Sequence, residues 1–166
     1  MKKMILFYVT VFISVTSLFA QKIVPIEYNG KKYEVLDMTA KGKVSWGGYE
    51  EIALDAAKSA SNGAANTKAI VLAVGKNAGY EGKPYAAKLC SEATDGGKDD
   101  WYLPAKEESD AIYAFKDKFN VEERGTIWTS TEASGTTAVT KYWYTGAYYD
   151  VQKVDEYHYV CMRKAD

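Results

Sequence analysis

A change of sequence pattern at Gly125 constrains the fold of this chain more than any other feature. Before it, apolar residues recur at helical spacing in short runs, the clearest being residues 105–118 with Ile112 and Phe115 on one side. After it, β-branched and aromatic residues dominate segments separated by turn residues. We expect strands at residues 126–132, 138–145, 147–153 and 156–163. Helices followed by an antiparallel meander predict an α+β fold with segregated layers.

The stretch Asp-Asp-Trp-Tyr-Leu-Pro at residues 99–104 leads directly into the 105–118 run. Proline fixes φ, and its missing N–H costs nothing at the first position of a helix. Acidic residues cluster early in the run and lysines late, as the helix dipole favours. We therefore expect an extended segment that turns into a helix at Pro104.

The N-terminal part of the chain contains a hairpin signal, two predicted helices at residues 50–60 and 84–93, and one segment that fits either a helix or a strand. Asn29-Gly30 separates two β-type runs and predicts a hairpin of residues 22–27 and 31–37. Residues 50–60 have helical spacing and end at Asn62-Gly63, a C-cap signal. Residues 68–74, after a possible cap at Asn66-Thr67, fit a helix or a buried strand equally. Residues 84–93 predict a short helix.

Residues 1–20 carry the three zones of an export signal, with Lys2 and Lys3 before an apolar run and Ala20 at its end. An uncleaved anchor is the alternative, but about 15 apolar residues fall short of the ~20 that span a bilayer. We expect cleavage before Gln21 and no membrane insertion afterwards. The mature chain, residues 21–166, is then one domain, and it is periplasmic, displayed at the cell surface or secreted.

Charge and cysteine content restrict the partners. Cleavage leaves 19 basic and 22 acidic residues, a balance that argues against a nucleic-acid partner, which would favour a basic patch. Cys90 and Cys161 are the two cysteines, and in an exported chain such a pair predicts one disulfide. A metal-binding or redox-active cysteine pair would need a CxxC-like spacing or several histidine ligands, and the sequence has neither.

No constellation in the sequence dictates catalysis, a metal or a cofactor. His158 is the only histidine, and a single imidazole does not build a typical zinc site. Asp95, Asp99 and Asp100 lack the ligand ladder of an EF-hand calcium loop. We therefore expect no enzyme activity and no cofactor.

Aromatic residues are the best candidates for ligand binding. Trp128 and Trp143 lie on predicted strands, where filling the core is the simpler role. Tyrosine rings flank the tight turn at Gly146, where exposed rings suit sugars or peptides, although cross-strand pairing explains them about as well. The candidate ligand-binding residues are Lys141, Trp143, Tyr144, Tyr148, Tyr149 and Asp150.

A series of short motifs occurs in a fixed order along the chain. They are AAKLC at residues 86–90, DGG at 95–97, DWYLP at 100–104, WTSTE at 128–132 and YVCMR at 159–163. In combination they resemble the Lcl C-terminal domain family, a set of bacterial exported domains with a C-type-lectin-like fold. The resemblance spans roughly residues 44–164. It implies a disulfide between a helix and the last strand, and it carries no established active site.

The resemblance extends to function only by analogy of fold. Some relatives bind sulfated glycosaminoglycans, which depends on basic surfaces that this slightly acidic chain lacks. We expect an exported, non-catalytic recognition module that binds a glycan or a surface protein. The alternatives are an enzyme of the lectin-like formylglycine-generating oxidase type, which needs a copper-binding cysteine pair, and a purely structural envelope protein.

Overall fold

The structure, a computed structural model, describes residues 21–48, 54–75 and 80–165. The predicted export signal and the first four residues of the predicted 50–60 helix lie outside these ranges. Six strands form two antiparallel sheets of three, with the orders β1-β2-β6 and β3-β4-β5. The strands are β1 (Ile23–Tyr28), β2 (Lys31–Asp37), β3 (Thr126–Glu132), β4 (Thr137–Tyr142), β5 (Tyr148–Gln152) and β6 (Val160–Lys164). The α+β fold class is thereby confirmed, and so is the predicted disulfide, which joins Cys90 to Cys161.

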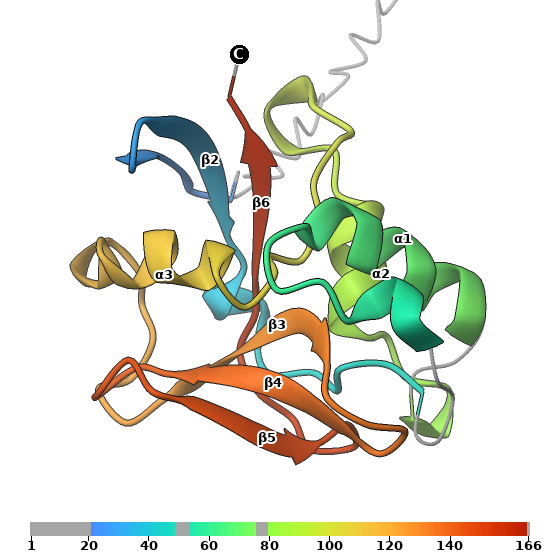
Figure 1. The fold of residues 1–166 in the computed structure, drawn as a ribbon. Helices are drawn as coiled ribbons and strands as arrows, with labels where there is room; N and C mark the ends of the chain where they lie inside the picture. Colours follow the sequence, from blue (N-terminus) through green and yellow to red (C-terminus); the bar gives the residue numbers. More distant parts are fainter. Residues whose placement is uncertain (1–20, 49–53, 76–79, 166) are drawn as a thin grey trace, which may run out of the picture.

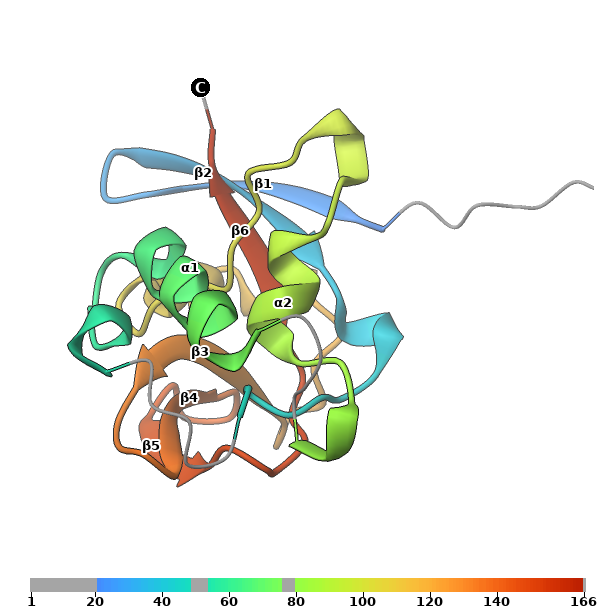
Figure 2. The ribbon, with the colours of Figure 1, turned by 90° about the vertical axis from the view of Figure 1, so that its right-hand side faces the viewer.

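Within the described residues, three α-helices flank the sheets. They are α1 (Gly63–Val74), α2 (Ala86–Ser91) and α3 (Glu108–Tyr113). Figures 1 and 2 show α1 and α2 lying together beside both sheets, while Figure 1 places α3 on the other side. Short 3₁₀ turns occur at Thr39–Lys41, Leu54–Ala57, Tyr80–Gly82, Asp95–Gly97 and Lys116–Lys118.

The N-terminal hairpin is confirmed, and its turn has the conformation that the sequence demands. Asn29 and Gly30 both take positive φ, 50° and 71°, as a two-residue turn of type I′ requires. The register pairs Tyr28 with Lys31 and Ile23 with Leu36.

The predicted four-strand meander is wrong in its last member. β3, β4 and β5 form a meander, but β6 leaves it and pairs with β2, with Leu36 opposite Cys161. The other edge of β6 meets the 99–104 stretch, where the Tyr102 N–H donates to the Met162 carbonyl at 2.9 Å and the Tyr102 carbonyl accepts from the Met162 N–H at 2.8 Å. β6 is therefore buried on both edges, and strand-type composition alone does not reveal which neighbours it takes.

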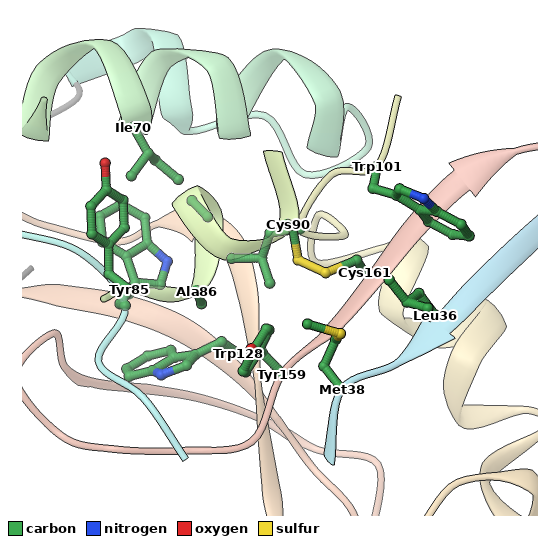
Figure 3. Packing of buried hydrophobic residues seen from close by; sticks show 14 of the residues in the cluster. Leu36, Met38, Ile70, Tyr85, Ala86, Cys90, Trp101, Trp128, Tyr159 and Cys161 are labelled. Carbon is green, nitrogen blue, oxygen red and sulfur yellow. A yellow bond between two sulfur atoms is a disulfide. The ribbon is translucent and has the colours of Figure 1, made fainter. Parts of the chain in front are cut away.

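The β2–β6 ladder separates two apolar cores, because its side chains alternate between its two faces. Leu36 and Cys161 face one cluster, whereas Val35 and Met162 face the other. Figure 3 shows the first cluster around the Cys90–Cys161 bond, which joins α2 to β6 with Cα atoms 5.3 Å apart. Closing a loop of about 70 residues stabilises a fold by ~4 kcal/mol in the chain-entropy model. The cluster's largest fully buried side chains are Trp46, Tyr85, Trp128 and Tyr159.

Asn62-Gly63 starts a helix rather than ending one. The Asn62 side chain accepts a hydrogen bond from the Ala65 N–H at 3.1 Å and caps α1. The described part of the predicted 50–60 helix contains only the short 3₁₀ turn Leu54–Ala57. Residues 68–74 are helical, and Asn66 and Thr67 are buried within α1 instead of capping it.

The central helix begins later than predicted because the Pro104 carbonyl bonds to β3 instead of to a helical amide, and side chains cap the free amides that follow it. Glu108 Oε2 accepts from the Ala105 N–H and Thr131 Oγ1 accepts from the Lys106 N–H, at 2.9 and 3.0 Å. The Pro104 carbonyl accepts from the Ser130 N–H at 2.8 Å and so extends along the edge of β3. The 105–118 segment thus contains α3 and one 3₁₀ turn, and Pro104 precedes the helix by several residues.

Candidate functional site

The β4–β5 hairpin presents most of the predicted ligand-binding residues. Its strands pair Lys141 with Tyr148 and Thr140 with Tyr149. The Tyr142 N–H donates to the Ala147 carbonyl and the Gly146 N–H to the Tyr142 carbonyl, both at 2.8 Å. β4 therefore ends at Tyr142, three residues earlier than predicted.

The turn of this hairpin is held against Tyr113 of α3. Gly146 has a φ of 74°, and a Cβ there would lie 2.6 Å from Cε1 of the Tyr113 ring, so only glycine fits. The Tyr113 hydroxyl also donates to the Tyr144 carbonyl at 3.4 Å. These contacts fix the backbone that carries Tyr144.

The predicted gathering of Tyr144, Tyr148 and Tyr149 is not what the structure shows. Tyr148 points to the face of the hairpin that packs on α3, where its hydroxyl donates to Asp110 Oδ1 at 2.6 Å. Tyr149, its neighbour in the strand, points to the opposite face. The pKa of Tyr148 is raised by burial and by Asp110, so its hydroxyl stays protonated as a donor.

Lys141 and Trp143 are committed to the interior. Lys141 is almost fully buried, forms an ion pair with Asp110, and places its Nζ 4.0 Å from the centre of the Tyr148 ring. Trp143 is buried with edge-to-face contacts to the rings of Tyr113 and Phe119, 6.0 and 6.3 Å between centroids. Both side chains attach α3 to the sheet. For Trp143 this is the core role that the sequence made the simpler prediction.

The exposed face of the hairpin carries a second group of rings, which we name the tyrosine cluster: Tyr142, Tyr144 and Tyr149. Tyr144 is 50% and Tyr149 52% exposed. The Tyr142 ring lies edge-on to both, with centroids 6.4 Å from Tyr144 and 5.9 Å from Tyr149. Asp150 follows Tyr149 and is also exposed.

Tyr142 is the residue of this surface that sequence reasoning missed. The sequence contains one signal for it: Tyr142 lies two residues before Tyr144, and alternate residues of a strand share a face. The contact with Tyr149 depends on the pairing register, which places Tyr149 opposite Thr140 and diagonal to Tyr142.

A buried glutamate, Glu108, fixes the backbone segment that leads into α3. Glu108 Oε2 accepts from the backbone N–H groups of Gly63 and Ala105, both at 2.9 Å, and Oε1 accepts from the Tyr102 hydroxyl at 3.2 Å. Burial, followed by the Glu108 charge, raises the pKa of Tyr102. Every one of these bonds is internal, so the group joins α1, the 99–104 stretch and α3.

A buried ion pair links the end of β3 to the residue that follows β5. Lys153 and Glu132 are fully buried and form an ion pair, with the Lys153 Nζ 4.6 Å from the centre of the Trp46 ring. Removing either partner of such a pair leaves a buried charge, which is strongly destabilising. Because the two residues lie at the ends of β3 and β5, the ion pair holds these strand ends together.

His158 also has an internal role. Its buried ring faces Glu122 with Nε2 and Oε2 2.9 Å apart, and Glu122 lies 3.4 Å from Lys43. The pKa of Glu122 is lowered, first by a hydrogen bond to its own backbone and then by His158. Within residues 21–48, 54–75 and 80–165 we find no group of three or more His, Cys, Asp or Glu side chains arranged for a metal ion.

Asp100, one of the three aspartates weighed as calcium ligands, is engaged by Arg163 of β6. The Arg163 Nε donates to Asp100 Oδ1 at 2.6 Å, and its Nη1 donates to Glu34 Oε2 at 2.8 Å. The bond from Arg163 lowers the pKa of Asp100. This carboxylate therefore belongs to an ion-pair network on the first sheet.

Comparison with known proteins gives no assignment: no protein-family model matches the chain, and no curated protein matches it significantly. In the part of the chain that the structure describes, no helix has the length and apolar character needed to cross a bilayer.

Proposed function

We propose that this protein is an exported, non-catalytic recognition module that binds a carbohydrate through the tyrosine cluster. The exposure of Tyr144 and Tyr149 beside the Tyr142 ring is the observation that carries the proposal. Tyrosine combines an apolar ring face with a polar hydroxyl, and it loses little conformational entropy when a ligand immobilises it. A sugar ring offers the matching surface, with C–H groups on its faces and hydroxyls around its rim.

The backbone beneath the cluster supports this function. Gly146 and Tyr144 are both held against Tyr113, so the turn is a positioned loop on a rigid sheet. Recognition residues concentrate on such loops. Pre-organised rings bind with a smaller loss of entropy than rings on a mobile segment.

The ionisable groups favour binding over catalysis. Tyr102, Tyr148 and Asp100 have shifted pKa values, but each is engaged by an internal partner: Glu108, Asp110 and Arg163 respectively. The two cysteines are joined, so the thiol pair that a formylglycine-generating type of enzyme needs is already engaged. An enzyme of this type would need a free thiol pair, which Cys90 and Cys161 do not supply.

The proposed C-type-lectin-like relationship rests on the motif resemblance and on the link between a helix and the last described strand. The disulfide joins α2 to β6, as that resemblance implies. A glycan ligand agrees with this relationship by analogy of fold.

A glycan array on the disulfide-intact mature protein, with and without calcium, tests the proposal. In the double variant Tyr144→Ala, Tyr149→Ala, affinity for any glycan found should fall at least tenfold, about 1.4 kcal/mol, the scale at which an interface anchor counts. Leu72→Ala is the matched control, because Leu72 is an exposed apolar residue on α1. Unchanged binding by the double variant, or loss of binding in the control, contradicts the proposal.

Tyr148 is excluded from this test because its substitution would disturb packing. Its hydroxyl bonds to Asp110 and to the Lys106 carbonyl, and two lysine ammonium groups lie over its ring. Loss of binding in a Tyr148→Ala variant would therefore not distinguish a contact residue from a destabilised one.

A further inference from the structure

The four outer edges of the two sheets are treated differently. The edge of β6 is covered by Tyr102. The edge of β3 is covered twice, since the Trp128 N–H donates to the His158 carbonyl at 2.9 Å and the Ser130 N–H to the Pro104 carbonyl at 2.8 Å. β1 and β5 are left as edge strands.

The β1 edge is protected by its sequence. The Lys22 carbonyl accepts from Asp37 of β2, so even-numbered residues of β1 point their amide groups inward and odd-numbered ones point outward. Pro25 occupies an outward position. A proline there removes the donor that an added strand would use, which is a common way to protect an edge.

The β5 edge has no proline and directs free backbone groups outward. The odd-numbered residues of this segment direct their backbone groups toward β4. The Ala147 carbonyl accepts from the Tyr142 N–H, the Tyr149 carbonyl accepts from Thr140 Oγ1 at 3.1 Å, and the Lys153 N–H donates to the Thr136 carbonyl. The alternate residues Tyr148, Asp150 and Gln152 therefore direct their N–H and carbonyl groups away from the sheet.

Tyr148 and Asp150 supply both of their backbone groups to this edge, and Gln152 supplies its N–H. The Gln152 carbonyl accepts from the Asp155 N–H at 3.1 Å, but the backbone groups of Tyr148 and Asp150 bond to no residue in the described ranges. Figures 1 and 2 show β5 at the outer side of its sheet. Asp150 is exposed, and its carboxylate forms no ion pair with a described residue.

We propose that the β5 edge binds an extended peptide segment as an added antiparallel strand, with a lysine or arginine opposite Asp150. The outward backbone groups supply the hydrogen bonds of such strand addition. An opposite charge across from Asp150 is favourable, and Tyr149 and Val151 favour aromatic or β-branched neighbours on the other face. This proposal depends on the strand edge and is independent of glycan binding.

A second copy of the chain fits this edge less well than a basic peptide. Symmetric antiparallel pairing of two β5 strands about Asp150 would place two aspartates opposite one another. Like charges directly opposite are destabilising. The mature chain also carries an excess of acidic residues, which favours a basic partner.

The probe is a synthetic peptide of about nine residues, Thr-Val-Thr-Val-Lys-Val-Thr-Val-Thr, followed by amide NMR of the ¹⁵N-labelled mature protein. Its counterpart has glutamate in place of lysine. We expect shifts at the Tyr148, Asp150 and Gln152 amides, and binding of the lysine peptide about fivefold tighter than the glutamate peptide. The preference should shrink at high salt, because the charges are exposed.

Two variants and a control decide the result. Asp150→Lys should invert the charge preference, and Asp150→Pro should abolish binding of both peptides, because it removes an outward donor without breaking the ladder to β4. Glu27→Lys makes the same charge change on the β1 edge and should have no effect. If Asp150→Pro does not fold, inversion by Asp150→Lys remains the deciding observation.

Three outcomes would overturn the proposal: shifts that spare β5, peptide binding that survives Asp150→Pro, or a dimer of the free protein that buries the β5 amides. Tyr144→Ala separates the two proposals. It should reduce glycan binding and leave peptide binding unchanged, so each can fail without the other.

Discussion

Replacing Gly63 with alanine should destabilise the protein far more than its position near a helix terminus suggests. A Cβ at this residue would lie 2.5 Å from Glu108 Oε2, 2.6 Å from the Leu103 carbonyl oxygen and 2.7 Å from the Ala105 nitrogen. Two of these neighbours are backbone atoms, and the third is a carboxylate held by three hydrogen bonds. None of them can move aside without breaking a bond.

The magnitude follows from two contributions. Overpacking a well-filled site costs ~1–3 kcal/mol, and weakening a hydrogen bond to a buried charged group costs ~1.5–3 kcal/mol. The two overlap, because relieving the clash is what stretches the bond, so we expect a loss of about 3 kcal/mol in the free energy of unfolding. For a domain of this size that corresponds to a decrease in Tm of roughly 6–12 °C.

Urea denaturation of the disulfide-intact protein, followed by tryptophan fluorescence, measures this loss. Ala64→Gly is the control, since Ala64 is exposed in the same helical turn. It should cost only the ~0.5–1 kcal/mol of a glycine in a helix. If Gly63→Ala unfolds within about 1 kcal/mol of the parent, the contacts around Glu108 are not rigid.

Two further outcomes follow from the ion pairs and buried hydroxyls. Tyr148→Phe removes the bonds to Asp110 and the Lys106 carbonyl, so we expect a loss of ~1 kcal/mol in urea denaturation with glycan affinity unchanged; a loss of affinity without a loss of stability would instead place Tyr148 in the site. Because Arg163 lowers the pKa of Asp100 in the folded state, this pair stabilises the protein above the unfolded value of about 3.9 and ceases to do so as pH falls through the lower folded value. Asp100→Asn should therefore narrow the difference in Tm between about pH 7 and pH 3, and an unchanged difference would contradict the assignment.

Local signals in the sequence predicted the local parts of the fold. Asn29-Gly30 predicted the hairpin because its backbone conformation depends on those two residues alone. Asn62-Gly63 misled because asparagine and glycine fit both ends of a helix. The Gly63 N–H also bonds to Glu108, 45 residues away, a contact at the start of α1 that no local window contains.

The sequence located the candidate site at the hairpin but did not predict which of its residues point to each face. Tyr148 and Tyr149 are adjacent tyrosines, and one points to α3 while the other points to solvent. Which is which depends on the β4–β5 register, since a slip of one residue would exchange them. That register is fixed by contacts such as Lys141 with Asp110 of α3, a partner that pairing within the hairpin does not reveal.

The ladder between β2 and β6 also determines when this protein can become folded. Its two strands are more than a hundred residues apart in sequence, and each contributes side chains to both apolar clusters. Neither cluster is complete until residues 160–164 pair with β2, because β6 supplies side chains to both. Cys161 lies in the same strand, so the covalent link to α2 depends on it as well. A chain that lacks this one short strand would leave both cores open and Cys90 without its partner.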